Sequence, residues 1–373
     1  MKFKLSCTAL NSRLSILSKA LPSKSTLPLL DCFVFEVKGQ QMIITASDNE
    51  NMMTIAMALD EADEDGRFAV VAHTIMNALR ELPEQPIDVS LNTETFIMSI
   101  DYLNGHFEFP AEKADEYPLM ETLNEDKTTI TLPAEVLLRN VSRSIFAIGN
   151  EELRPVMNGI YFDLTTESMA IVASDGHKLV RNRIYSIKTE QPASFVMPRK
   201  PATLLKSTLP QDETPVVVSF NGDSAEITFG EIYLLCRLIS GRYPNYNAVI
   251  PQDNPNQVIA DRRALLGAMR RVSLFLNPDS LVRLNISQGK VTLRSEDIEF
   301  YSHAEESVVC DYLGMPMCIG FKGQAFVDIL NNLECDNVRL ELADPSRPGI
   351  VVPEEQVEGE DVVMLVMPML LND

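Results

Sequence analysis

Hydrophobic and polar positions alternate along much of the chain, and a period of two residues predicts β-strands. The clearest alternating runs are 87–91, 96–100, 216–220, 225–229 and 338–342. Six other stretches are helix-like, and we expect helices over 8–24, 72–82, 133–147, 198–209, 261–276 and 322–333. Because strands outnumber helices several-fold, the pattern favours an α+β fold over a single doubly wound sheet.

One unit of sequence occurs three times along the chain. The run 27–37 matches the run 154–164, which lies 127 positions later, and each leads into an apolar strand. Each of these strands ends in the same tripeptide, Ala-Ser-Asp, at 46–48 and at 173–175. A weaker third copy begins at 281–286. An internal repeat of this kind predicts one supersecondary unit used three times.

Two irregular stretches rich in proline and aspartate, 117–127 and 243–256, separate the repeated units. Three units in 373 residues give a normal domain size. We therefore expect three domains, each with two helices and antiparallel strands. Their expected limits are 1–122, 128–250 and 257–373.

The chain carries 32 basic and 53 acidic residues, a formal net charge of −21. Such a charge opposes binding to a nucleic-acid backbone unless the few cations are gathered in one place. The six expected helices hold fourteen cations and only four acidic residues, or +10, which leaves −31 for the remainder. Exposed lysine and arginine explain this bias on one helix, but six equivalent basic helices favour a common surface that faces a polyanion.

No zinc-finger spacing and no arginine-rich arm is present, so contact with nucleic acid would be made to phosphates, largely independent of sequence. The candidate DNA-binding cations are Arg13, Lys19, Lys24, Arg80, Arg139, Arg143, Arg199, Lys200, Lys206, Arg270 and Arg271.

The sequence predicts neither a cofactor nor a metal. Phosphate-binding glycine loops and zinc-binding histidine motifs are absent, and the six cysteines form no C-x-x-C pair. Scattered thiols favour a reduced, cytoplasmic environment. We expect no membrane partner, because no stretch approaches the roughly 20 apolar residues of a membrane span. We also expect no signal peptide, because residues 1–7 alternate apolar and polar like a strand and lead into no continuous apolar core.

The segment Ser174-Asp175-Gly176-His177 is the richest in reactive side chains. Residues so close in sequence do not easily form the ordered chain of hydrogen bonds that a catalytic triad needs. An Asp-Gly turn or a binding loop is the favoured interpretation. A hydrolase that uses Asp175 and His177 remains the alternative.

The C-terminal run 362–371 is very apolar for a chain end. Its first half reads as a strand, which Pro368 prevents from continuing as a central strand. An apolar surface rich in methionine suits an adaptable peptide groove.

Several segments together resemble the β subunit family of bacterial DNA polymerase III, the sliding clamps, over essentially the whole length. They are Met1-Lys2-Phe3, Thr26-Leu27-Pro28, 174–179, 196–200, 241–246 and 366–369. The resemblance implies a head-to-tail homodimer, a six-domain ring with helices lining the hole. It implies no catalysis, and it implies as partners duplex DNA, the replicative polymerase, an ATP-dependent clamp loader and other repair and replication proteins.

The resemblance also implies two sets of contact residues. A partner-peptide site would use Met157, Ser174, Gly176, His177, Lys178, Leu179, Pro244, Val249, Ile350, Leu365, Val366, Met367, Pro368 and Met369. The dimer contact would place Leu274 and Phe275 against Met76 and Phe107 of the neighbour.

The chain departs from the family pattern at two positions. Arginines that relatives carry are Ala248 and Leu370 here, and Asn372-Asp373 extend the end. These changes make the rim of the peptide site less cationic. In its first domain, Lys24 stands where relatives carry an arginine that contacts DNA. The alternative function is a three-repeat interaction scaffold that does not encircle DNA.

Overall fold

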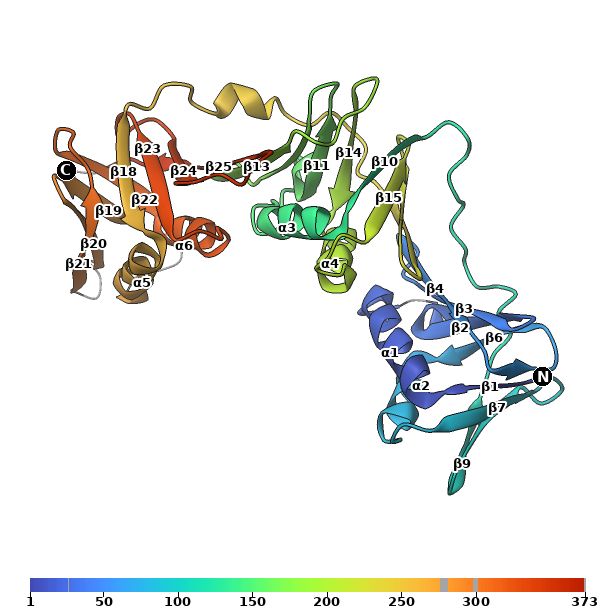
Figure 1. Ribbon diagram of the computed structural model, residues 1–373. Coiled ribbons are helices and arrows are strands. Elements are labelled where there is room, and N and C mark those ends of the chain that lie inside the picture. Colours follow the sequence, from blue (N-terminus) through green and yellow to red (C-terminus); the bar gives the residue numbers. More distant parts are fainter. Residues whose placement is uncertain (26, 276–280, 298–300, 372–373) are drawn as a thin grey trace. The chain divides into compact units, whose positions relative to one another are not determined.

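The computed structural model describes residues 1–25, 27–275, 281–297 and 301–371, except for the side chain of Phe275 (Figure 1). Thr26 of the family motif and the terminal Asn372 and Asp373 therefore lie outside the described residues, as does the last residue of the helix expected over 261–276.

The helices follow the sequence expectation closely. They are α1 Cys7–Leu17, α2 Ala72–Arg80, α3 Ala134–Ile145, α4 Arg199–Thr208, α5 Arg262–Val272 and α6 Gly323–Asn331. Short 3-10 turns are η1 Ser18–Ala20, η2 Pro28–Asp31, η3 Pro155–Asn158, η4 Tyr246–Val249 and η5 Ser273–Phe275. The helix expected over 8–24 was too long: Leu21 is extended, with ψ 151°, because the following Pro22 disfavours a helical conformation there.

The strands occur in the same order in each repeat. The first repeat holds β1 Lys2–Ser6, β2 Cys32–Lys38, β3 Gln41–Ser47, β4 Asn51–Ala58, β5 Glu61–Ala62, β6 Gly66–Val71, β7 Pro86–Asn92, β8 Ile97–Tyr102 and β9 Gly105–Pro110. The second holds β10 Thr128–Pro133, β11 Gly159–Leu164, β12 Met169–Ser174, β13 Lys178–Ile184, β14 Ala193–Pro198, β15 Pro215–Phe220, β16 Ser224–Phe229 and β17 Ile232–Arg237. The third holds β18 Asn256–Asp261, β19 Leu281–Ser287, β20 Lys290–Asp297, β21 Ser302–Asp311, β22 Met317–Lys322, β23 Asn337–Leu342, β24 Gly349–Pro353, β25 Glu360–Val366 and β26 Pro368–Met369.

Neighbouring repeats share sheets. Strand β17 of the second repeat pairs antiparallel with β4 of the first, and β25 of the third pairs antiparallel with β13 of the second. We call the β4–β17 pairing the first junction and the β13–β25 pairing the second junction. Edge strands that pair in this way leave no open backbone donors and acceptors at the joins.

The packing therefore does not follow the covalent repeats. One compact unit consists of Met1–Glu135 and Leu204–Leu238, and the other of Val136–Thr203 and Ile239–Asp373. The second repeat is divided, with one of its sheets in each unit. Each junction lies within a single unit.

Within each unit, helices pack on the sheets with an apolar face. Helix α1 buries Leu10, Leu14 and Leu17 and packs against α2, while α5 packs against α6 (Figure 1). The cations of these helices stand mainly on the opposite, polar face, as expected for amphipathic helices. No helix in the described ranges is long and apolar enough to cross a membrane.

Candidate functional site

A pocket of about 260 Å³ lies at the second junction. Strands β13 and β25, the loop before β13 and the segment after β17 contribute its walls. Its lining is Arg154, Met157, Ser174, Gly176, Lys178, Leu179, Tyr243, Pro244, Asn245, Tyr246, Val249, Leu365 and Met367.

The floor of this pocket is apolar and rigid. Met157, Leu179 and Leu365 are buried, and Tyr243 stacks on Tyr161 with ring centroids 4.6 Å apart. The hydroxyl of Tyr246 donates a 2.7 Å hydrogen bond to a carboxylate of β11, which fixes the ring. At the rim, Val249 and Met367 are 51% and 39% exposed. A buried floor with exposed apolar edges suits side-chain anchors of a peptide.

The loop 174–178 is held by its own hydrogen bonds. The Asp175 carboxylate accepts from the backbone amides of His177 and Lys178, both at 2.9 Å, and from the Lys178 ammonium at 2.7 Å. Burial opposes ionisation of Asp175, but these donors outweigh it, and the pKa of the carboxyl lies below its usual value. Gly176 has φ +87°, a left-handed conformation that favours glycine.

This loop geometry favours a turn over a catalytic site. The Ser174 hydroxyl donates to the Lys178 carbonyl at 2.9 Å, and Asp175 is taken up by backbone amides and Lys178 rather than by the His177 imidazole. A nucleophile and its base must lie within hydrogen-bond reach of each other. Within the described ranges no cluster of three or more metal-binding side chains occurs either.

The structure brings together nine of the peptide-site residues expected from the sequence. Ile350 and Val366 are buried beside or behind the pocket, and His177 is exposed on the loop. Pro368 and Met369 do not line the pocket and form the short edge strand β26, which pairs with β22. Strand β25 ends at Val366, before Pro368, as the sequence predicted. Four lining residues were missed as candidates: Arg154, Tyr243, Asn245 and Tyr246. The last three lie in the segment 241–246, where two tyrosines close to Pro244 were the available signal.

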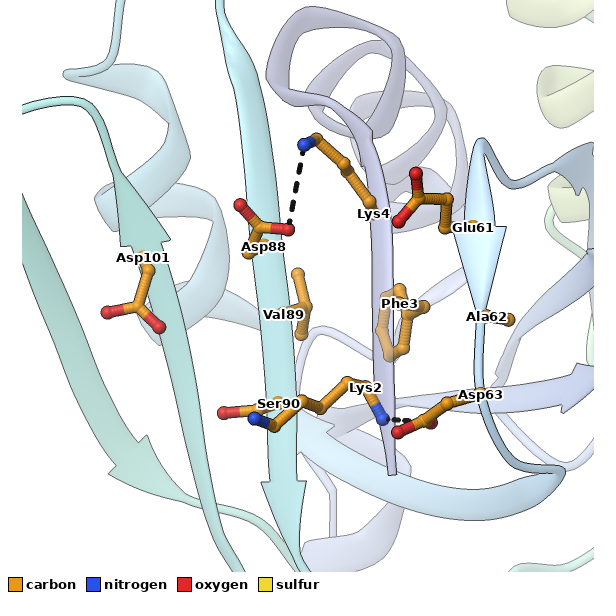
Figure 2. A pocket seen from close by; sticks show the side chains of 10 residues that line it. All are labelled: Lys2, Phe3, Lys4, Glu61, Ala62, Asp63, Asp88, Val89, Ser90 and Asp101. Carbon is orange, nitrogen blue, oxygen red and sulfur yellow. Dashed lines mark hydrogen bonds and ion pairs between the residues drawn. The ribbon is translucent and has the colours of Figure 1, made fainter.

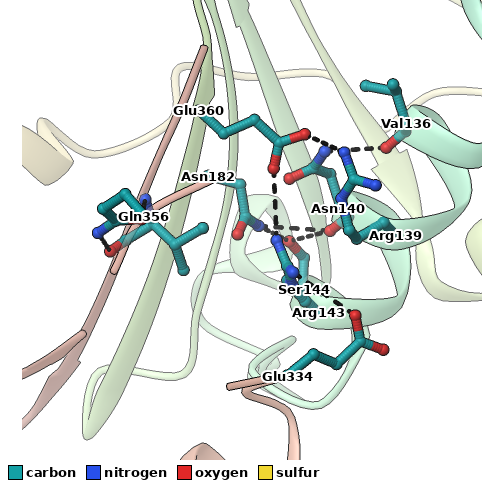
Figure 3. A network of polar contacts seen from close by, with 10 residues as sticks. Val136, Arg139, Asn140, Arg143, Ser144, Asn182, Glu334, Gln356 and Glu360 are labelled. Carbon is teal, nitrogen blue, oxygen red and sulfur yellow. Dashed lines mark hydrogen bonds and ion pairs between the residues drawn. The ribbon is translucent and has the colours of Figure 1, made fainter. Parts of the chain in front are cut away.

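Arg143 corrects one expectation. Its side chain is 7% exposed, and its guanidinium lies 3.4 Å from Glu360 and 3.5 Å from Glu334. Figure 3 shows Arg139 and Arg143 of α3 facing Glu360 at the start of β25. Burial lowers the pKa of the Arg143 guanidinium, and the two carboxylates act in the opposite direction. Arg143 is therefore part of a contact between repeats and is not exposed to phosphates.

We call Arg139, Arg143 and Glu360 the clasp of the second junction. Neighbouring amides complete its surroundings: Asn182 on β13 donates to the Ser144 hydroxyl at 2.9 Å (Figure 3). Both acceptor oxygens of Glu360 are used, one by each arginine. The clasp thus fastens α3 of the second repeat to β25 of the third.

The other candidate cations differ in how freely they could meet phosphates. Arg13 pairs with Glu231 and Arg271 with Glu306, while Lys19, Arg199 and Arg270 donate to carbonyl or amide oxygens. Lys200 is half-buried. Lys24, Arg80 and Lys206 are exposed, and among the described residues they form no ion pair.

The expected dimer-contact residues are available to a partner only in part. Leu274 is 75% exposed, while Met76 and Phe107 are half-buried. The Phe107 ring lies against Tyr102, with centroids 5.0 Å apart. The side chain of Phe275 lies outside the described residues.

A second hollow, of about 440 Å³, is open and polar (Figure 2). Carboxylates of Glu61, Asp63, Asp88 and Asp101 surround it, and Lys4 lies 3.9 Å from Asp88. Its apolar members, Phe3 and Val89, are buried in the sheet. It offers no exposed apolar anchor, in contrast to the pocket at the second junction.

Comparison with known proteins gives one consistent result. Three family models match in order: the DNA polymerase III beta subunit N-terminal domain at 1–121, its central domain at 131–245 and its C-terminal domain at 247–370. The relatives named "Beta sliding clamp" from Pseudomonas putida and Escherichia coli are 26% and 27% identical, each over the full length of both chains. A crystal structure of the Pseudomonas aeruginosa DNA polymerase sliding clamp with a ligand matches with a TM-score of 0.93 at 25% identity, again over both whole chains.

Proposed function

The chain belongs to the DNA polymerase III beta subunit family and is a DNA sliding clamp, a subunit without catalysis of its own. On this basis we propose how two copies form a ring and which site binds client proteins. Two copies close head to tail into a ring around duplex DNA. The second junction binds a peptide segment of the polymerase. Sliding results from weak phosphate contacts, and retention results from closure.

Two matching open edges support ring closure. At each internal junction, the last long strand of one repeat, β17 or β25, pairs with the fourth strand of the repeat before it. The last strand of the first repeat, β9, pairs only with β8 among the described residues. The corresponding strand of the third repeat, β21, pairs with β20, and on its other side β18 reaches only Cys310 and Asp311. One copy thus carries both halves of a third junction.

A second copy completes that junction by pairing its β9 with β21. A heterologous contact of this kind closes into a ring when the rotation between copies allows it. Phe107 lies on β9 and Leu274 lies directly after α5, so both sides of the proposed contact carry an expected interface residue. Closure also covers two edge strands that would otherwise expose unpaired backbone groups.

The cations best suited to contact DNA are those whose side chains neither pair with a carboxylate nor donate to another oxygen among the described residues. Lys24, Arg80 and Lys206 meet that condition and all belong to the compact unit that contains the first junction. Because the chain as a whole is acidic, free cations of this kind would give short-lived, salt-sensitive contacts. Such contacts permit sliding.

The pocket at the second junction is the site proposed for client proteins. Its buried floor takes leucine or phenylalanine side chains, and its few polar groups fix the direction of a short segment with a glutamine. The replicative polymerase, an ATP-dependent clamp loader and other repair and replication proteins are the proposed users. A cytoplasmic location agrees with the six cysteines, all free of disulfides.

The mass and shape in solution test closure. We expect sedimentation at micromolar concentration to give about twice 41.7 kDa, and small-angle scattering to give the profile of a hollow ring. A compact monomer at that concentration would contradict the proposal and favour the alternative, an interaction scaffold that does not encircle DNA.

A further inference from the structure

The last residues of the chain form a strap between two repeats. After β25, the amide of Met367 donates a 2.8 Å hydrogen bond to the carbonyl of His177 in the second repeat. Directly after Met367, β26 pairs with β22 of the third repeat, with Met369 opposite Gly320 and Pro368 opposite Phe321. Met367, which lines the pocket, is therefore held on one side by its hydrogen bond to the second repeat and on the other by the pairing of β26 with β22.

The attachment to β22 is short. It consists of only two paired residues, one of which is a proline that lacks an amide hydrogen. A strand this short contributes little by its backbone hydrogen bonds alone. Side-chain packing must supply the remainder of the attachment.

That packing takes place over Gly320. A Cβ atom at this position would lie 2.3 Å from Leu281 Cδ1, 2.9 Å from Leu371 Cδ2 and 3.2 Å from the Met369 carbonyl oxygen. The φ of Gly320 is not in the left-handed region, so the site demands space and not an unusual backbone conformation. Leu281 and Leu371 together fill the space that a side chain on residue 320 would take.

We propose that Gly320 is a positioning residue for client binding: its missing side chain lets Leu371 seat on β22, and this seat holds Met367 in the wall of the pocket. Gly320 does not line the pocket. Its effect on a client acts through the strap. The effect on clients rests on the proposed function, whereas the seating of the strap does not.

Two variants of the full-length protein test this proposal. In Gly320→Ala, the new methyl group would overlap Leu281 Cδ1 most and Leu371 Cδ2 next, so both side chains must move and the seat of Leu371 on β22 is disturbed. Leu371→Ala weakens the same seat from the side of the tail and leaves Leu281 in place, at a residue that is only partly buried. Gly222→Ala is the matched control, because a Cβ atom there meets nothing within 4 Å and its φ is not left-handed.

The first measurement needs no client. Hydrogen–deuterium exchange of the segment that contains Met367 and Met369 should become faster in both variants and stay unchanged in the control. The second measurement is the Kd of a synthetic peptide with a glutamine and paired leucine and phenylalanine anchors, followed by fluorescence anisotropy. We expect about tenfold weaker binding in both variants, the scale of a modest packing defect.

The outcomes separate the two claims. Unchanged exchange in both variants overturns the seating of the strap on Gly320. Faster exchange with an unchanged Kd overturns the positioning role. If the unmodified protein binds no such peptide, the proposed client site fails, while faster exchange in the variants still supports the strap.

Discussion

The two internal junctions have nearly the same backbone and different side chains. At the first junction, the amide of Arg237 donates to the Glu50 carbonyl at 2.9 Å, and at the second, the amide of Met367 donates to the His177 carbonyl at 2.8 Å. The loops before β4 and β13 both contain a left-handed residue, Asn49 with φ 79° at the first. The repeated sequence thus specifies the same join twice.

Side chains make only one of these joins resemble a peptide site. Where the second junction has Arg154, His177 and Met367 around its pocket, the first has Leu27, Glu50 and Arg237 at the corresponding positions. The first junction carries an exposed ion pair between Arg237 and Glu50 instead of an apolar wall. Function in this fold therefore depends on the side chains placed on a repeated frame.

The ion pairs that fasten the two junctions differ in burial. Glu360 of the clasp is 5% exposed and faces two arginines, whereas Glu231, which pairs with Arg13 at the first junction, is 56% exposed. Replacing Glu360 by alanine should lower the free energy of unfolding by about 3 kcal/mol, because the buried Arg143 and the partly buried Arg139 lose their shared carboxylate and only Arg143 keeps a second one, Glu334. Glu231→Ala should cost only about 0.2–1 kcal/mol. Urea unfolding measures both effects. Equal decreases of the unfolding midpoint in Glu360→Ala and Glu231→Ala, each relative to the unmodified protein, would contradict this difference.

Removing residues 367–373 should abolish the client site while leaving the fold intact. The deletion takes away the Met367 wall and the strap, and we expect the peptide Kd to rise about 100-fold or more. Arg237→Ala changes the corresponding residue of the first junction and should leave the Kd as it is. The mass of the dimer serves as the folding control. An unaltered Kd after the deletion would show that the client binds elsewhere.

Acid should loosen the loop of the second junction through Asp175. Its folded pKa lies below that of the unfolded chain, about 3.9, so its contribution to stability is present above that value and is lost as pH falls through the folded pKa. Asp175→Asn should be less stable at pH 7 and lack this part of the acid dependence, as measured by peptide affinity and urea unfolding between pH 7 and 3. Asp48→Asn should have the smaller effect, because Asn51 stands in place of Lys178 beside that carboxylate. If the free energy of unfolding depended on pH in the same way in the unmodified protein and in Asp175→Asn, the carboxylate of Asp175 would not be the source of this acid dependence.

The smallest expected effect concerns DNA. Lys206→Gln removes one free cation and should reduce the slope of log K against log salt by about 0.9, the value for one phosphate contact. Arg143→Gln removes an equal charge from the clasp and should leave the slope unchanged. A lower slope for Arg143→Gln would mean that its guanidinium leaves Glu360 to meet DNA.

Much of this fold could be predicted from local sequence. Local periodicity located the six helices, with the first one too long, and the alternating runs that became β7, β8, β15, β16 and β23, while the 127-residue offset revealed the repeat. The sharing of sheets could not be predicted, because β13 and β25 are brought together by edge pairing across some 180 residues. A similarly long separation explains the error on Arg143. Its position on a basic helix predicted an exposed side chain, whereas its ion-pair partner Glu360 lies 217 residues further along the chain. The pocket residues were partly predictable because they cluster in four short segments, 154–157, 174–179, 243–249 and 365–367.

Retention on DNA of different topology tests the central claim most directly. The protein is loaded on a nicked circular plasmid by an ATP-dependent clamp loader, the loader is removed, and half of the sample is linearised with a restriction enzyme. A closed ring should stay on the circle and slide off the linear DNA, so its half-life on the linear form should be much shorter at the same salt concentration. Equal half-lives on both forms would contradict encirclement.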